Sequence, residues 1–179
     1  MTTTAYDKAT TRWTIDPDET QVEFDVKSFW GLANVHGHFD RFTGSYETGP
    51  DGVRIELTAD ADSLDTGNNT RDKHLRSPHF FHVAEHPQIH FLSTSVHDTG
   101  NGSLEVIGRL GTAGRATSLK FPATLRRVGD ELEVEATTTV DQSELGMSTG
   151  TLGMIRRPAT LHVKARLRET PVSEGAVGV

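Results

Sequence analysis

The chain has 179 residues, of which 34% are hydrophobic and 24% charged, and its formal net charge is −7. This length suits a single domain with a substantial core, and no apolar run approaches the roughly 20 residues of a membrane-spanning helix. The chain has no cysteine, which excludes disulfide frameworks, thiol nucleophiles and cysteine-ligated metal centres.

Both ends of the chain are expected to be loose. Residues 1–11 and 170–179 are predicted to form flexible tails around one domain at 12–169. The N-terminal stretch lacks a continuous apolar run, so no signal peptide is visible and a cytoplasmic protein is expected.

Alternation of apolar and polar residues dominates the domain. Val22, Phe24 and Val26 alternate with polar side chains, which is the pattern of a strand with one buried and one wet face. Similar runs follow at Gly37–Tyr46, Val53–Ala59, Ile89–Val96, Leu104–Leu110, Leu119–Leu125, Leu132–Val140 and Leu161–Leu167. These runs predict about eight strands.

Turn signals separate these runs and indicate how the strands connect. Gly49–Gly52, Asp98–Gly102 and Val128–Asp130 combine glycine with aspartate, proline or asparagine, and the last two are short enough for hairpins. We therefore predict a mostly antiparallel all-β domain, which closes into a barrel or splits into a sandwich. A cavity is favoured over a filled interior by small inward residues, which are Gly108, Ala123, Ala136 and Ala165.

One segment, at about residues 68–86, breaks the alternation and predicts a helical insertion. Asn68 or Asn69 is suited to cap a short helix over Thr70–Arg76, which the following Ser-Pro pair would end. A second short helix is predicted over His79–Glu85. The apolar residues available to face the core are Leu75, Phe80, Phe81 and Val83.

Charge is unevenly distributed along the chain. Residues 1–105 hold 17 acidic and eight basic side chains, whereas residues 106–179 hold eight acidic and ten basic ones. The plain interpretation of the basic part is a set of solvated outer strand faces, and the alternative is a positive field that meets an anionic ligand or a membrane surface. A nucleic-acid binder would show a strong basic excess, so no nucleic-acid partner is expected.

An ordered series of motifs over roughly Trp13–Arg168 resembles the YceI-like, or polyisoprenoid-binding, family. Trp13–Asp16 resembles the family's opening W-x-I-D, and Val22–Lys27 resembles its first F-x-V-K strand. The further matching motifs are, in order, Gly37–Phe39 with Phe42–Gly44, Ser63–Asn68, Arg71-Asp72, His74-Leu75, Ser77, Phe80-Phe81, His86-Pro87 with Ile89–Phe91, and Gly108–Leu110.

The resemblance implies a lipocalin-like, eight-stranded antiparallel barrel with a short helical insertion and an elongated isoprenoid lipid inside it. It implies non-catalytic binding or carriage of a polyprenyl lipid or isoprenoid quinone, with no cofactor besides that ligand. A transient membrane-surface contact and a homodimer are further options. The chain departs from the family at Gln142–Met147, where a motif of the R-x-x-F-G type is usual, and the secretion signal of many members is not visible.

Candidate ligand-binding residues follow from the inward faces of the strands. Because each buried methylene contributes about 0.8 kcal/mol, an apolar wall suits such a ligand, although the same residues can simply fill a core. The predicted wall residues are Phe24, Val26, Phe39, Phe91, Val106, Leu110, Phe121 and Val134. Trp30, Met147 and Met154 are predicted at the mouth, with Arg156 beside a polar head group.

The histidines provide the main alternative function. His79, His82, His86 and His90 lie close in sequence, and His82 and His86 would share one face of a helix. A metal-dependent enzyme built on this group is the rival hypothesis, and an interaction protein with a filled barrel is another. The H-E-x-x-H and phosphate-loop motifs do not occur, so we expect a protein that is not an enzyme and has no metal site.

Overall fold

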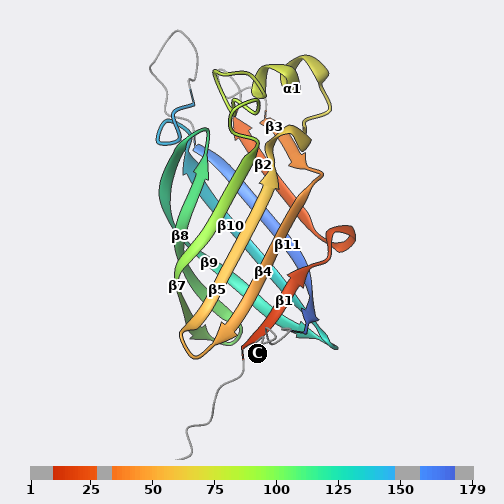
Figure 1. Ribbon diagram of the computed structural model, residues 1–179, viewed down its shortest axis with the longest axis vertical. Coiled ribbons are helices and arrows are strands. Elements are labelled where there is room, and N and C mark those ends of the chain that lie inside the picture. Colours follow the sequence, from red (N-terminus) through yellow and green to blue (C-terminus); the bar gives the residue numbers. More distant parts are fainter. Residues whose placement is uncertain (1–9, 28–33, 148–157, 172–179) are drawn as a thin grey trace, which may run out of the picture.

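The computed structural model describes residues 10–27, 34–147 and 158–171, which form a closed antiparallel barrel of eight strands with one short α-helix at its upper end (Figure 1). In chain order the elements are β1 (Thr11–Ile15), η1 (Pro17–Glu19), β2 (Gln21–Lys27), β3 (Asn34–Phe39), β4 (Phe42–Gly49), β5 (Gly52–Asp60), η3 (Ala61–Ser63), β6 (Leu64–Asp65), α1 (Asn69–Leu75), β7 (Gln88–Gly100), β8 (Ser103–Thr112), β9 (Arg115–Val128), β10 (Glu131–Asp141) and β11 (Pro158–Thr170). The predicted all-β barrel with a helical insertion is confirmed.

The barrel is an up-and-down meander in which the first three strands are interrupted. β1 and β2 form the first barrel strand, β3 and β4 the second, and β5 and β6 the third. Each strand pairs with the next one along the chain, and β11 closes the barrel against both β1 and β2. The sequence predicted one strand over Gly37–Tyr46, whereas Asp40 and Arg41 separate β3 from β4.

The interruptions have local causes. Asp16 caps the single turn η1, which begins at Pro17. The first N–H of a helical turn has no partner within the turn, so proline is tolerated at this position. Asp60 caps η3 in the same way, by accepting a hydrogen bond from the N–H of Asp62 at 2.9 Å. Since the N–H of Asp60 also donates to the carbonyl of Arg41 at 2.9 Å, the second and third barrel strands bend at the same level.

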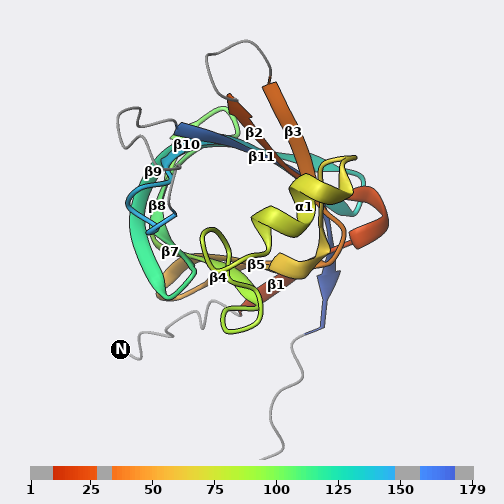
Figure 2. The ribbon, with the colours of Figure 1, turned by 90° about the horizontal axis from the view of Figure 1, so that it is seen from above.

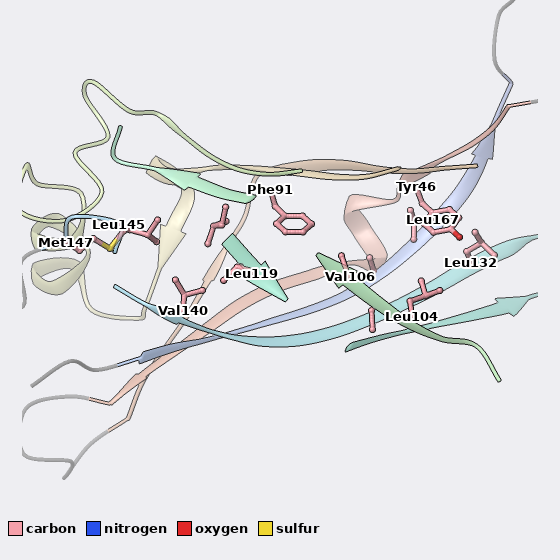
Figure 3. Close-up of a cluster of buried hydrophobic side chains, with 13 residues drawn as sticks. Tyr46, Phe91, Leu104, Val106, Leu119, Leu132, Val140, Leu145, Met147 and Leu167 are labelled. Atoms are coloured by element: carbon pink, nitrogen blue, oxygen red, sulfur yellow. The ribbon is translucent and has the colours of Figure 1, made fainter. Parts of the chain in front are cut away.

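Burial follows the predicted alternation. In β8, Leu104, Val106 and Leu110 are buried, whereas Arg109 on the opposite face is exposed. The inward side chains form one large apolar cluster along the barrel (Figure 3) and a smaller one on β2, β3, β5 and β6. None of the helices in the described part of the chain is long and apolar enough to cross a membrane.

α1 lies over one side of the upper opening of the barrel (Figure 2). The predicted cap is confirmed, because the Asn68 side chain accepts a hydrogen bond from the N–H of Arg71 at 3.0 Å. The second predicted helix, over His79–Glu85, is wrong, since these residues form turns. The N–H of Phe81 donates to the carbonyl of Leu75 at 3.0 Å, so the chain folds back onto the end of α1.

Several basic side chains of β9 and β11 lie beside acidic residues of β10. Arg126 lies 2.8 Å from Glu133, Arg168 donates to Glu131 at 2.8 Å, and Arg166 bonds to both glutamates. The hydrogen bond from Arg168 and the weaker effect of the hydrogen bond from Arg166 lower the pKa of the Glu131 carboxyl. These pairs support the interpretation of the basic runs on these strands as solvated outer faces.

Candidate ligand cavity

The upper half of the barrel interior encloses a cavity of about 210 Å³ beneath α1. Apolar side chains make up most of its wall, and the polar exceptions are Glu23, Arg71, Thr112 and Gln142. The strands contribute Val22, Phe24, Val26, Val35, Phe39, Leu57, Ala59, Ile89, Phe91, Leu110, Val140, Ala159, Leu161 and Val163.

A row of aromatic rings forms one side of the cavity. The ring centroids of Phe24 and Phe39 are 5.4 Å apart, and Phe81 meets Phe39 edge-on at 6.1 Å. Gly37 makes this row possible, because a Cβ at this position would lie 2.4 Å from the ring of Phe24. The row joins β2 and β3 to the turns that follow α1.

α1 and those turns form the roof. Leu75, Phe80 and Phe81 line the cavity from above. Asp72 on the same helix is buried, and its carboxylate accepts hydrogen bonds from the backbone and the hydroxyl of Thr66. The roof is therefore fixed to the chain that leaves β6.

One positive charge is held at the edge of the cavity. The guanidinium of Arg71 donates to the hydroxyl of Thr66 at 2.7 Å and to its carbonyl at 2.8 Å. Because these bonds fix the side chain, Arg71 presents a positioned donor group to the cavity that it lines.

Two neutral polar side chains are buried in the wall. Thr112 ends β8 with 5% of its surface exposed, and Gln142 follows β10 with 9% exposed. The hydroxyl of Thr112 has no hydrogen-bond partner among the described residues. An unpaired buried hydroxyl costs roughly 1–3 kcal/mol, so a ligand oxygen at this point would satisfy a group that the described residues leave unsatisfied.

Phe91 forms the floor of the cavity. Leu57, Phe91 and Val163 line both this cavity and a second one of about 80 Å³ in the lower half of the barrel. The Phe91 ring lies on Gly108, where a Cβ would be 2.5 Å from a ring carbon, and its centroid is 5.5 Å from that of Phe121. Figure 3, in which the lower half of the barrel is on the right, shows this ring between Val140 and the group of Tyr46, Leu104, Leu132 and Leu167.

The lower cavity has a mostly apolar lining and holds one buried phenol. Burial and the negative charge of Asp98 raise the pKa of Tyr46, so its hydroxyl stays protonated at neutral pH. The lower half therefore combines a small volume with an uncharged phenol.

The predicted site residues divide between the two cavities. The upper cavity is lined by Phe24, Val26, Phe39, Phe91, Leu110 and Met147. The lower cavity is lined by Phe91 together with Val106, Phe121 and Val134. Trp30, Met154 and Arg156 lie outside the described residues. Thr112 and Gln142 were not predicted as site residues, although Thr112 continues the two-residue period of Leu110 in β8.

The histidine group is only partly assembled in the structure. His82 and His86 come together with Glu85, whereas His79 and His90 are not part of this group among the described residues. None of these side chains lines the upper cavity. Glu85 was missed because only the order H-E-x-x-H was considered, and the reverse order H-x-x-E-H would have indicated it.

Comparison with known proteins gives the same family over most of the chain. Residues 13–167 match the YceI-like domain family. A UPF0312 protein of Pectobacterium atrosepticum is 34% identical over 113 residues, which are 62% of this chain and 58% of that protein. The protein YceI of Salmonella arizonae is 36% identical over 104 residues, or 56% of this chain and 54% of that protein. These alignments thus span little more than half the length of the curated relatives.

Two solved structures share the fold at low sequence identity. BcnA from Burkholderia cenocepacia superposes with a TM-score of 0.76 at 18% identity, covering 85% of this chain and 98% of BcnA. A polyisoprenoid binding domain from Saccharophagus degradans gives a TM-score of 0.72 at 13% identity, covering 88% of this chain and 98% of that domain.

Proposed function

Because the chain belongs to the YceI-like domain family, we propose that it binds a long isoprenoid lipid, a polyprenyl lipid or an isoprenoid quinone, in the cavity beneath α1. The observation that carries this proposal is an apolar cavity whose wall contains the Thr112 hydroxyl, a buried group without a hydrogen-bond partner in the described part of the chain. A solved relative of the same fold is a polyisoprenoid binding domain, which supports the same ligand class. The function is carriage or storage of the lipid, without chemistry on it.

The polar residues of the cavity wall determine which end of the ligand lies at the top of the cavity. Thr112 at the upper end of β8, Gln142 and Arg71 offer hydrogen bonds to a head-group oxygen. The isoprenoid chain then runs down past Leu110 towards Phe91, where each buried methylene contributes about 0.8 kcal/mol. A few polar groups that orient a mostly apolar ligand are typical of small-molecule sites.

The volume limits how much of the chain fits without rearrangement. Since an apolar cavity of about 150 Å³ holds one benzene, 210 Å³ has room for about one or two isoprene units. A longer tail requires the Phe91 ring, which packs on Gly108, to move away from the boundary between the two cavities, and this movement would open the path to the lower cavity. The ligand is therefore expected to be bound with an enlarged interior.

Equilibrium binding of ubiquinone analogues of increasing tail length tests this proposal. Leu161→Trp fills the upper cavity, because Leu161 lines it from β11, and we expect at least tenfold weaker binding. Lys164→Trp is the matched control on the outer face of the same strand, where the side chain is 64% exposed, and it should bind as the unmodified protein does. Equal affinities of the two variants would contradict the proposed site.

A further inference from the structure

A compact group of metal-ligating side chains lies on the last of the turns that follow α1, between Phe81 and β7. We propose that His82, Glu85 and His86 bind a divalent transition-metal ion of the zinc class. One ligand atom from each residue lies within 4.8 Å of the other two. This site is separate from the lipid cavity, because none of the three residues lines it.

The three side chains need only small rotations to coordinate one ion. The His82 and His86 rings meet edge-on with their centroids 5.7 Å apart, and Nδ1 of His82 lies 3.8 Å from Oε2 of Glu85. Zinc–nitrogen bonds of about 2.0–2.1 Å place tetrahedral ligands roughly 3.3 Å from one another. Glu85 is mostly exposed, so its carboxylate can move by the required distance without disturbing packing.

The backbone holds the turn in the conformation that the site needs. The N–H groups of Glu85 and His86 both donate to the carbonyl of His82, at 3.0 and 2.8 Å. The N–H of His82 donates to the carbonyl of Ser77 at 3.0 Å, which ties the turn to the end of α1. His82 adopts a φ of 49°, a left-handed conformation in which histidine is enriched among residues other than glycine.

A glycine on the neighbouring hairpin leaves room for one ligand ring. Gly114, in the turn between β8 and β9, has a φ of +74°, and a Cβ there would lie 3.0 Å from Cε1 of His86. The ring therefore packs directly on the hairpin backbone, which limits the rotamers that His86 can adopt. A positioned imidazole loses less freedom when it binds an ion.

The donor set selects the class of ion. Two imidazoles and one carboxylate form a His₂Glu set, which suits zinc and other late first-row divalent ions, and a fourth position stays open to water. The ion would fix the segment directly after Phe80 and Phe81, which line the cavity, without touching the lipid.

A second histidine group provides the matched control. His36 and His162 bond to different oxygens of Asp25, at 3.0 and 3.1 Å, on the outer face of β2, β3 and β11. Unlike the proposed ligands, these three residues do not form a group with ligand atoms within 4.8 Å of one another.

Titration of the full chain, freed of metal by chelator, with ZnCl₂ in a calorimeter tests the proposal. We expect saturable binding of one ion and at least tenfold weaker binding by His86→Ala and by His82→Asn, since asparagine tolerates a left-handed backbone. His36→Ala should bind as the unmodified protein does. Absence of saturable binding, or an equal loss in the His36 variant, would overturn the proposal.

Cobalt spectroscopy on the same proteins separates loss of ligands from loss of fold. The unmodified protein loaded with Co²⁺ should show visible absorption bands of an ion with protein ligands, and His86→Ala should lose them while its thermal unfolding without metal is unchanged. Retention of the bands in both His86→Ala and His82→Asn would contradict the site. Lipid binding is measured separately, so either proposal can fail without the other.

Discussion

The upper and lower halves of the barrel interior are built from the same alternating strands, yet one is hollow and the other is nearly full. The lower half contains the rings of Trp13 and Tyr46, 5.8 Å apart, and a cavity of only about 80 Å³. Its core is completed by Leu104, Leu132 and Leu167, which are buried (Figure 3). The upper half keeps about 210 Å³ beneath a separate roof.

The difference shows that alternation alone does not decide whether a barrel has a cavity. In the lower half, large side chains from facing strands meet one another. In the upper half the opening is covered by α1 and the turns after it, so the strand residues need not reach the centre. A roof thus allows an apolar interior to stay open. Phe91 lies at the boundary between the hollow upper half and the nearly filled lower half.

Removal of the boundary should have the largest effect. Phe91→Ala joins the two cavities and deletes a buried ring, so we expect the free energy of unfolding to fall by about 3–5 kcal/mol. The variant should also shift the preference among ubiquinone analogues towards longer tails. Urea unfolding and tail-length titrations measure both effects, and an unchanged length preference would contradict the role of Phe91 as the floor.

Matched leucine truncations should sharpen the contrast in packing. Leu104→Ala in the filled half, where Leu104 lines neither cavity, should cost about 4 kcal/mol, whereas Leu110→Ala beside the upper cavity should cost about 2 kcal/mol, because the neighbours of Leu110 already lack contacts on one side. Urea unfolding of the two variants gives the comparison. Equal losses would show that the upper half is as densely packed as the lower.

Thr112→Val tests the polar point of the upper half with a smaller effect. It removes a buried hydroxyl that has no hydrogen-bond partner among the described residues, so the ligand-free protein should become about 1 kcal/mol more stable. Binding of a quinone should weaken, while binding of an isoprenoid hydrocarbon without a head group should not change. A loss of stability would contradict the assignment of an unsatisfied hydroxyl.

The charge network at the closure of the barrel should give a weak pH dependence. Hydrogen bonds from Arg168 and Arg166 lower the pKa of Glu131 in the folded state, so this contribution is present above the unfolded pKa of about 4.3 and is lost as the pH falls through the lower folded value. Stability should therefore decrease on acidification below about pH 5. Glu131→Gln should flatten that part of the urea-unfolding profile, and an unaltered profile would exclude this carboxyl as a cause.

Much of the fold could be predicted from the sequence because a two-residue period reports directly on the face of a strand. The breaks at Asp40-Arg41 and Ala61–Ser63 were not predicted, since each replaces a few residues within an otherwise regular pattern. The cap at Asn68 was predicted because its side-chain chemistry is local. Turns at His79–Glu85 were mistaken for a helix because the N–H groups of Phe81, His82 and Val83 reach back five to seven residues, and not the four residues of an α-helix.

The sequence pattern predicted which side chains of the candidate site point into the barrel, but not how far along the barrel axis each of them lies. Val106, Phe121 and Val134 have the same inward parity as Leu110, but the strand tilt and register place them in the lower half. The small inward residues do not mark the larger cavity. The space at Gly108 is filled by the Phe91 ring, and the lower cavity, which is the smaller one, is lined by Ala123, Ala136 and Ala165. The cytoplasmic location, the membrane contact and the homodimer stay predictions.

Organic extraction of the natively purified protein, followed by mass spectrometry, tests the central claim most directly. The account predicts a prenyl lipid or isoprenoid quinone in near one-to-one ratio with the unmodified protein and its loss from Leu161→Trp, with Lys164→Trp retaining it. Recovery of no isoprenoid from the unmodified protein, together with no uptake of added quinone, would contradict the claim that the upper half of this barrel is a lipid site.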